Sequence, residues 1–534
     1  MSKIRNSWRL FKKQVTWVNL FFILITFQIF KGLNSRWLLQ NGDAAGYVDI
    51  LSPNSGMNTF RFAYGFSTLR LQELLALGPD EITEVGFNNP YSTKPFYQAH
   101  PYLIGYVIRL IKIPLFQIET VPLILLAISY SMGVMTLTMF GVKKNIQPIK
   151  IFLLLSVIVT SVIFIGSLRG QPYIDRLTFG PFIVIFLRLT ESQSLTKRKW
   201  IELYGLAVFC ILLSERAALM VGVLIIMVTL LTIKYKQTID LHHKVVILFG
   251  ILGIGWYQFW ASKISANRDV ANNTSLKLLW SNLKTFLIGD RQQQAIIFLL
   301  ALVPFFLFVV FLNRYFLVFL LFILPNVLVS IGGAELSGFS THYHAMYLPI
   351  AAAVILLAVV SLKELPRKSW RNQLVLPVIV LALSSNLTMN SVNKYSLSNI
   401  TDNLGQLADS FGFIRPDMQV IRAATKIEYL AIFELIEPKS SVLSMPEGFM
   451  PAGVHSGFTR IDYFPVGIGQ SEYLLVPFID SEYSQVEFSL FGLVPEKNRA
   501  KWSSAILNEI NKSYVEFAKY NGTYGFISVY KMIV

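Results

Sequence analysis

The sequence predicts a mainly α-helical, polytopic membrane protein with a small α/β domain at its C-terminal end. Of its 534 residues, 54% are hydrophobic and only 15% are charged. A soluble protein of this length needs far more charge to cover its surface. Apolar runs of nearly spanning length recur up to about residue 388, and the composition then shifts toward that of a soluble domain.

The apolar runs set the expected number of membrane spans. A spanning helix needs about 20 apolar residues, and runs near this length predict about eleven spans. They lie near 15–33, 119–141, 149–166, 173–190, 200–214, 216–233, 245–261, 294–312, 315–331, 344–361 and 372–388. The fifth and sixth runs are short, so one broken hairpin is the alternative there. The first run resembles a signal peptide but lacks a small-x-small cleavage site, and we assign it to a span.

Basic residues predict the orientation of the chain. The net charge of +16 does not indicate nucleic-acid binding, because the basic residues cluster in alternate short connections between apolar runs. The positive-inside rule then predicts a cytoplasmic N-terminus, with the long loops and the C-terminal segment on the exterior face. We expect a transmembrane domain over 1–388, including an exterior loop at 34–118, and an exterior α/β domain over 389–534. The basic residues in question are Lys143, Lys144, Lys150, Lys197, Arg198, Lys199, Lys234, Lys236, Lys244, Arg314, Lys363, Arg367, Lys368 and Arg371.

The exterior loop contains the two carboxylates that we consider as catalytic candidates. Asp43 and Asp49 follow the first apolar run directly, and glycines lie beside them. A carboxylate near a membrane has its pKa raised by desolvation and suits a general base for an acceptor hydroxyl. The plain alternative is a solvated or helix-capping carboxylate. Six residues of separation put the two on different helix faces; we prefer Asp43 as the base, and Asp49 stays open.

Two segments of this loop are expected to be helices in the plane of the membrane interface. One is the leucine-rich run at 69–77, which Gly78 and Pro79 end, and the other spans 100–113 and carries Arg109. His100 precedes the second helix. It either caps that helix or lines the same exterior cavity as Asp43.

Ionisable residues at exterior turns are candidates to bind a phosphate. Arg169, Asp175 and Arg176 surround the turn between the third and fourth runs. They form either a surface ion pair or a bidentate clamp on a lipid phosphate. Glu215 and Arg216 interrupt a long apolar stretch, where ionisable residues are costly and usually functional. In a hairpin, the pair lies at an outer turn and this cost falls; Arg216 is the better phosphate partner.

Histidines complete the set of candidates. His342 and His344 lie before an apolar run, two residues apart and therefore on different helix faces, which argues against zinc and favours bonds to phosphate or sugar. His242 and His243 instead suggest a solvated basic connection. Motifs for phosphate loops, dinucleotides, zinc proteases and serine hydrolases are absent from the sequence. We therefore expect no organic cofactor; a divalent metal stays an open alternative that no motif in the sequence supports.

Alternating elements predict the C-terminal α/β domain. Helical spacing is seen over 417–436 and 498–519. Short strands are expected at 441–445, 473–478 and 524–532.

The order of these features resembles that of the GT-C class of integral-membrane glycosyltransferases. Those proteins place an acidic residue in a long first exterior loop, follow it with a His-Pro or proline-rich interfacial helix, and often end in an exterior domain. The matching residues here are Gly42-Asp43 to Asp49 and His100-Pro101-Tyr102-Leu103.

More narrowly, the chain resembles an uncharacterised bacterial family of polytopic membrane proteins in the same clan. One departure is Arg216, where that family has an acidic residue after the glutamate. The matching runs are Ser214-Glu215-Arg216, Thr341-His342-Tyr343-His344-Ala345, and the segments 435–442, 460–465 and 473–476.

The resemblance implies a glycosyltransferase in the bacterial inner membrane with a periplasmic C-terminal domain. It would move a sugar from a polyprenyl-phosphate-linked donor to a glycan, lipid or protein acceptor of the cell envelope, on the exterior face. A transporter or lipid flippase is the first alternative, and a non-catalytic protein of envelope assembly is the second.

Overall fold

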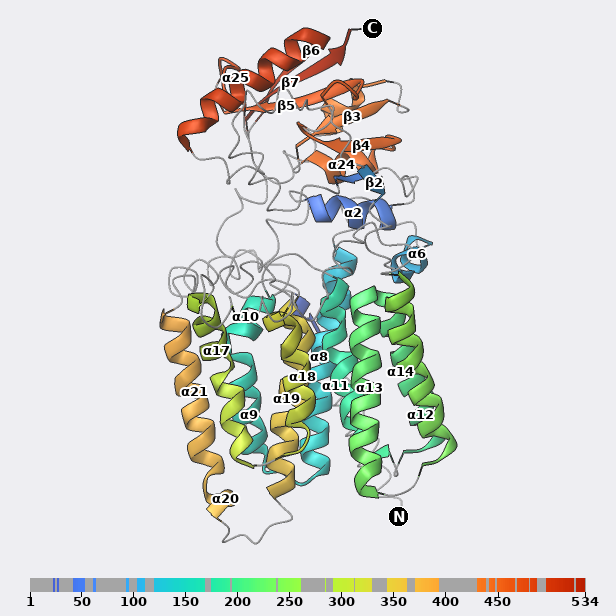
Figure 1. Cartoon of the computed structure of the whole chain (residues 1–534), viewed down its shortest axis with the longest axis vertical. Helices are drawn as coiled ribbons and strands as arrows, with labels where there is room; N and C mark the ends of the chain where they lie inside the picture. The colour runs from blue at the N-terminus through green and yellow to red at the C-terminus, as the bar shows by residue number, and fades with distance from the viewer. Residues whose placement is uncertain are drawn as a thin grey trace. The chain divides into compact units, whose positions relative to one another are not determined.

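The computed structural model of the chain is mainly helical, with a small β-sheet formed by its C-terminal residues (Figure 1). The chain divides into two compact units. The helical unit comprises Met1–Ser35, Thr120–Lys263 and Arg268–Ile414, and the α/β unit comprises Arg36–Glu119, Ile264–Asn267 and Arg415–Val534. Apart from a few isolated positions, the structure describes residues 42–52, 61–63, 93–95, 103–110, 120–168, 174–192, 195–236, 239–260, 292–311, 313–328, 343–362, 370–392, 430–437, 441–446, 449–465, 468–479, 481–486, 496–522 and 525–533.

Long helices lie side by side in the helical unit, with their axes roughly aligned (Figure 1). Their positions coincide with the predicted spans after the first, and three of these spans are each divided between two helical elements, over 148–168, 174–190 and 292–311. The span at 15–33 lies almost wholly outside the described residues. The helices are α8 (Thr120–Lys143), α9 (Pro148–Val159), α10 (Val162–Leu168), the 3-10 helix η1 (Ile174–Thr178), α11 (Phe179–Thr190), α12 (Lys197–Leu213), α13 (Glu215–Lys236), α14 (Leu241–Phe259), α17 (Gln292–Phe306), the 3-10 helix η4 (Leu307–Phe311), α18 (Phe316–Leu328), α19 (Tyr343–Ser361), α20 (Trp370–Gln373) and α21 (Val375–Val392).

Length and composition suit some of these helices to a membrane. Among the described residues, two helical segments are long and apolar enough to cross a bilayer, Val121–Lys143 and Glu215–Ile233. Shorter apolar helical segments occur at Pro148–Val159, Ile296–Phe311, Met346–Ser361 and Val375–Met389. These features indicate membrane association, while the number of about eleven spans stays a prediction from hydropathy.

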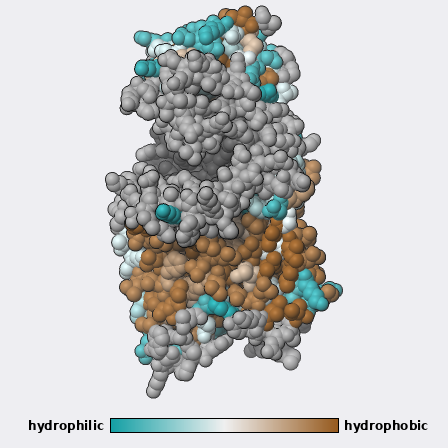
Figure 2. Space-filling model, viewed as in Figure 1, coloured by the Kyte–Doolittle hydropathy of each residue, from teal (hydrophilic) through white to brown (hydrophobic). Residues whose placement is uncertain are grey.

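Apolar side chains cover the outside of the helical unit as well as its core. Phe152, Ile201, Ile251, Leu317 and Leu381 are all more than half exposed, and they come from five different helices. Figure 2 shows apolar residues over much of the visible face of this unit. A helix of a soluble protein keeps a polar outer face. The outer surface of this unit is therefore typical of contact with lipid.

Glycines bring α13 and α14 into close contact. A Cβ added to Gly222 would lie 2.5 Å from the carbonyl oxygen of Gly250, and one added to Gly253 would lie 2.5 Å from that of Ala218. Small residues at such positions let helix backbones approach each other, as they do in membrane proteins. Ala218 precedes Gly222 in α13, whereas its partner Gly253 follows Gly250 in α14, so the two helices run antiparallel.

Several of the basic connections predicted to be cytoplasmic meet at one end of the helical unit. The carboxylate of Glu191, after α11, accepts Lys143 Nζ at 2.5 Å and Lys144 Nζ at 2.6 Å. Arg188 Nη1 lies 2.6 Å from the carboxylate of Glu202 in α12. Burial alone would raise the pKa of the Glu191 carboxyl, but the two ammonium groups hold it below its ordinary value. The end of α8, the end of α11 and the start of α12 are thereby joined.

The structure corrects the prediction that His242 and His243 form a solvated connection. His243 is buried; its Nδ1 lies 2.6 Å from the carboxylate of Asp240, and its Nε2 lies 2.9 Å from the hydroxyl of Ser192. The ring of His242 stacks on that of Trp200, with centroids 5.1 Å apart. Both histidines therefore pack at the start of α14, because their rings find hydrogen-bonding and aromatic partners on neighbouring segments.

A five-stranded mixed sheet forms the centre of the α/β unit, in the order β4-β3-β5-β7-β6. β3 (Val442–Met445) runs parallel to both β4 (Arg460–Tyr463) and β5 (Tyr473–Phe478). β7 (Gly525–Met532) is antiparallel to both β5 and β6 (Tyr514–Gly522). The strands predicted at 441–445, 473–478 and 524–532 are confirmed.

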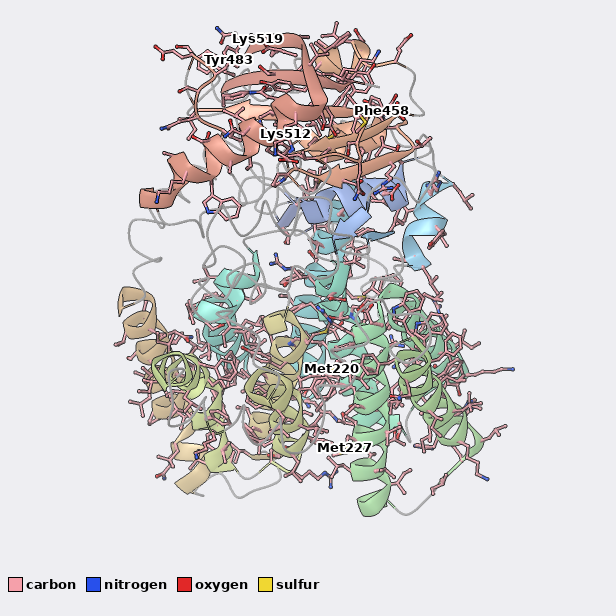
Figure 3. The ribbon with its side chains drawn as sticks, turned by 45° about the horizontal axis from the view of Figure 1, so that its top comes forward. Met220, Met227, Phe458, Tyr483, Lys512 and Lys519 are labelled. Atoms are coloured by element: carbon pink, nitrogen blue, oxygen red, sulfur yellow. The ribbon has the colours of Figure 1, made fainter. Side chains whose placement is uncertain are left out.

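Helices cover the two faces of this sheet. α25 (Glu496–Ser513) packs Ile506 and Ile510 against Leu474 and Val476 on one face. On the other face, α24 (Met450–His455) brings Gly453 against the side chains of β3 and β4. At the edge of the sheet, Lys519 Nζ lies 4.5 Å from the ring centroid of Tyr483 (Figure 3), which links the 481–486 segment to β6.

Two sequence predictions for this domain are incomplete. The helix predicted over 498–519 ends at Ser513, where the chain enters β6, and β4 was not predicted. β6 forms because it pairs with β7, and such pairing outweighs local helix propensity. The helix predicted over 417–436 is described only from residue 430, and residues 430–434 are helical.

Part of the predicted exterior loop folds with the C-terminal residues. α2 (Gly42–Leu51) packs against α24 and against α6 (Leu103–Arg109), while β1 (Arg61–Ala63) pairs with β2 (Thr93–Pro95) and lies beside β4. The sequence boundary at residue 388 assigns the loop to the transmembrane domain, whereas the structure groups 36–119 with the α/β unit. Hydropathy carries no information on which distant segments pack together. The helix predicted over 69–77 lies outside the described residues.

Candidate functional site

The candidate site in the helical unit begins at η1, where the chain enters α11. Ser129 of α8 fixes this turn: its hydroxyl donates to the carbonyl of Leu177 at 2.8 Å and accepts the N–H of Gly180 at 3.0 Å. A Cβ added at Gly180 would lie 2.2 Å from the backbone oxygen of Ser129, so a glycine is needed there. The anchored turn contains Asp175 and Arg176, and both side chains are buried.

A single residue, Ser214, separates α12 from α13. Its extended backbone, with φ −160° and ψ 165°, ends α12. Its hydroxyl accepts the N–H of Ala217 at 3.0 Å and thereby caps α13. The two helices pack against each other, so Glu215 and Arg216 lie at the turn of a helical hairpin, which was one of the two arrangements that the sequence allowed.

The hydroxyl of Ser214 also donates a hydrogen bond to the carboxylate of Asp175, which joins the hairpin turn to η1. Arg216 Nη1 lies 3.9 Å from Asp175 Oδ2, and Arg216 Nε lies 4.0 Å from Glu215 Oε1. The Asp175 side chain is only 3% exposed, whereas that of Arg216 is 34% exposed. The cluster therefore presents a guanidinium at the surface of the helical unit, with a buried carboxylate behind it.

The start of α19 lies near the same turn. Oγ1 of Thr178 in η1 lies 3.9 Å from the sulfur of Met346. Because α19 begins at Tyr343, the backbone of His344 belongs to the first turn of that helix, close to η1. The structure thus brings the helix position of His344 toward Asp175, although the side chain of His344 lies outside the described residues.

Sequence reasoning missed Tyr257 of α14 and the bridging role of Ser214. Tyr257 lies close enough to Glu215 and Arg216 to interact electrostatically with both. A tyrosine near the end of an apolar helix is ordinary in membrane proteins, so its residue type gave no signal. Ser214 lies 39 positions from Asp175, and no sequence pattern pairs them.

The arrangement suits recognition of an anion more than proton transfer. Buried ionic groups are stable only when partners satisfy them, and Asp175 has the hydroxyl of Ser214 and the guanidinium of Arg216. Arginine binds phosphate through a planar fork of donors. Arg216 is thus the side chain of this cluster that is best placed to contact a phosphate.

The two catalytic candidates of the exterior loop both lie on α2, in the α/β unit. Asp49 is buried, with 1% of its surface exposed. Its carbonyl oxygen accepts a hydrogen bond from Arg109 Nη1 of α6 at 3.2 Å. Asp43 lies in the first turn of α2, and its side chain is outside the described residues.

The remaining candidates, His100, Arg169 and His342, also lie outside the described residues. Within the part of the chain that the structure describes, no group of three or more His, Cys, Asp or Glu residues is arranged to hold a metal ion. Comparison of the sequence with profiles of known protein families and with curated proteins finds no match.

Proposed function

We propose that this chain is a membrane glycosyltransferase of the GT-C type. It would take a sugar from a polyprenyl-phosphate-linked donor and pass it to an envelope acceptor on the exterior face of the inner membrane. The observation that carries this proposal is the position of Arg216. It is a part-exposed guanidinium at the end of an apolar helical unit, and its Nη1 lies 3.9 Å from a buried carboxylate.

A lipid-linked sugar phosphate needs an apolar surface for its chain and a cation for its phosphate. The exposed apolar side chains of the helical unit supply the first, and Arg216 supplies the second. As the bond between sugar and phosphate breaks, negative charge grows on the phosphate, and a nearby guanidinium stabilises it. Arg176 is fully buried in η1, so it is a weaker candidate than Arg216 for the phosphate, and the start of α19 lies close to the same turn.

The same proposal gives Asp43 the role of general base for the acceptor hydroxyl. Asp49 is the weaker candidate because its carboxylate is buried in the α/β unit. With the basic connections on the cytoplasmic side, the turn at Ser214 would face the exterior, since α12 and α13 each run from one end of the helical unit to the other.

A transporter or flippase is the second candidate, and the break between α12 and α13 at Ser214 favours it. Transporters bind their substrates on interrupted helices whose ends face the substrate. In a transporter, Asp175 and Arg216 would line a translocation path, and the protein would move a lipid without transferring a sugar.

The deciding experiment is sugar transfer by purified protein in lipid nanodiscs, with a panel of polyprenyl-phosphate sugars. Wild type is expected to transfer sugar. Arg216→Gln is expected to lower the rate about 100-fold, as the loss of a charge-stabilising donor does. Arg198→Gln is the matched control, because that arginine is 89% exposed and lies at the basic end of the unit.

Comparison of Asp43→Asn with Asp49→Asn shows which of the two carboxylates is the general base. A loss of about 100-fold or more in a folded variant would assign the base to Asp43. Transfer that survives in Asp43→Asn and disappears in Asp49→Asn would move the role to Asp49. No transfer by wild type with any donor, together with lipid movement across vesicles, would replace the enzyme with the transporter.

A further inference from the structure

We propose that His455 of α24 is a positioning residue for α2, so that the α/β unit holds the helix that carries Asp43. The proposal extends the proposed function, because it matters for catalysis only if Asp43 is the base. It gives the C-terminal residues a direct role in the geometry of the reaction, beyond covering a cavity or binding an acceptor.

The hydrogen bond between Ser52 and His455 is the first observation. Ser52 Oγ lies 3.0 Å from His455 Nδ1, although the two residues are 403 positions apart in the chain. Ser52 directly follows the last residue of α2, and His455 is the last residue of α24. Ser52 is fully buried, and its backbone N–H continues the helix by donating to the carbonyl of Val48 at 2.7 Å. The bond therefore fixes the end of α2 rather than a flexible loop.

Two contacts from α6 hold the same end of α2. Arg109 donates to the carbonyl oxygen of Asp49, one of the last carbonyl groups of α2, which lack partners inside the helix. Gly105 lies so close to Ile50 that an added Cβ would be 2.3 Å from a methyl carbon of Ile50. The end of α2 is thus held between α6 on one side and α24 on another.

Isolated helices of ten residues are unstable in water, so α2 depends on these contacts for its structure and its direction. Val48, Asp49 and Ile50 are buried against the rest of the α/β unit. Asp43 lies six residues before Asp49, in the first turn of the same helix. A change in the rotation or direction of α2 at its fixed end moves the other end, where Asp43 lies.

Burial supports the hydrogen bond chemically. It lowers the pKa of His455 below its ordinary value, so the imidazole is neutral at pH 7 and one of its nitrogens can accept the hydroxyl of Ser52. Charged side chains on nearby segments are Asp49 of α2 and the ion pair of Arg460 with Asp462 on β4, where Arg460 Nη2 lies 2.7 Å from Asp462 Oδ2.

Hydrogen exchange on the full-length protein in nanodiscs tests the positioning without any need for activity. His455→Leu should raise the exchange rates of the α2 amides about fivefold, the effect of losing one hydrogen bond, while the amides of β5 keep their wild-type rates. His455→Asn should restore protection, because its amide reaches the place of Nδ1. Ser456→Ala is the control, since that hydroxyl donates to the carbonyl of Ala452 within the same turn of α24, at 2.9 Å. Unchanged α2 exchange in His455→Leu would overturn the proposal.

Activity measurements complete the test. His455→Leu should lower kcat about tenfold or more with little change in the KM for the donor lipid, and His455→Asn should recover most of it. A His455→Leu protein with looser α2 and unchanged kcat would overturn the catalytic part of the proposal. A wild type that transfers no sugar, with the exchange results as expected, would instead contradict the proposed function and leave α2 positioned by the α/β unit.

Discussion

Substitution of Ser214 by alanine tests the link between the hairpin turn and η1. The hydroxyl accepts the N–H of Ala217 as a helix cap, and loss of such a cap costs about 1 kcal/mol. The same hydroxyl donates to the buried carboxylate of Asp175, and loss of a hydrogen bond to a charged group costs about 1.5–3 kcal/mol. We therefore expect Ser214→Ala to destabilise the helical unit by roughly 2–4 kcal/mol.

Thermal unfolding of purified protein in detergent measures this effect as an apparent Tm, because unfolding of a membrane protein is commonly irreversible. The expected decrease is roughly 3–8 °C for a unit of this size. Ser156→Ala is the matched control: that exposed hydroxyl bonds to the carbonyl of Phe152 within its own helix α9, at 2.9 Å, so its loss should change the Tm by less than about 1 °C. If Ser214→Ala has the same apparent Tm as the wild type, the hydroxyl does not join the two turns and the geometry described for the site is wrong.

Three further substitutions or conditions test other parts of the structure. Gly180→Ala should sharply reduce the yield of folded protein in size-exclusion chromatography, because its Cβ would lie 2.2 Å from a backbone oxygen of α8. Gly205→Ala should be tolerated, because a Cβ there meets no atom of the described residues within 4 Å, and equal yields of the two variants would refute the close contact at Gly180. The pKa of His455 in the folded state is below its ordinary value of 6.5, so as the pH falls the unfolded state binds a proton first. The α/β unit of the wild type should therefore lose stability below about pH 6.5, and that of His455→Asn should lose less, as measured by tryptophan fluorescence in urea. Tyr514→Phe should destabilise the α/β unit by about 1–3 kcal/mol in the same assay, because the hydroxyl forms hydrogen bonds with two backbone groups of the 469–471 turn, each at 2.8 Å. Burial raises the pKa of this hydroxyl to about 12, and an unchanged urea midpoint would contradict the two bonds.

Hydropathy predicted the positions of the helices well, because each long helix of the helical unit corresponds to a continuous run of apolar residues in the sequence. The strands β3, β5 and β7 were found for the same reason, since each is a short apolar run between turn residues. β6 was missed because its residues were read as the end of α25, and only its pairing with β7 decides between the two states. Pairing between two strands is a tertiary contact, and the local pattern of a single sequence does not reveal it.

In the candidate site, too, the local sequence reveals some residues, whereas others are revealed only by contacts between distant segments. Asp175, Glu215 and Arg216 were found because ionisable residues stand out in apolar surroundings. The partner that joins them, Ser214, was not, since a serine at a helix junction is common. The contact of α2 with α24 was also missed, because no local pattern links segments some 400 residues apart in the chain.

On the proposed topology, the position of the charged cluster along the helices favours the proposed transferase over the transporter. α12 has 17 residues and spans about 26 Å from the basic end to Ser214, and α13 has 22 residues and spans about 33 Å back. The hydrocarbon core of a bilayer is about 30 Å thick, so a cluster at Ser214 lies near one membrane surface when the basic end lies at the other. Transporters bind substrate near the midplane, about 15 Å from either surface. On the proposed topology, the phosphate of a lipid-linked donor would lie at that same surface, within reach of Arg216.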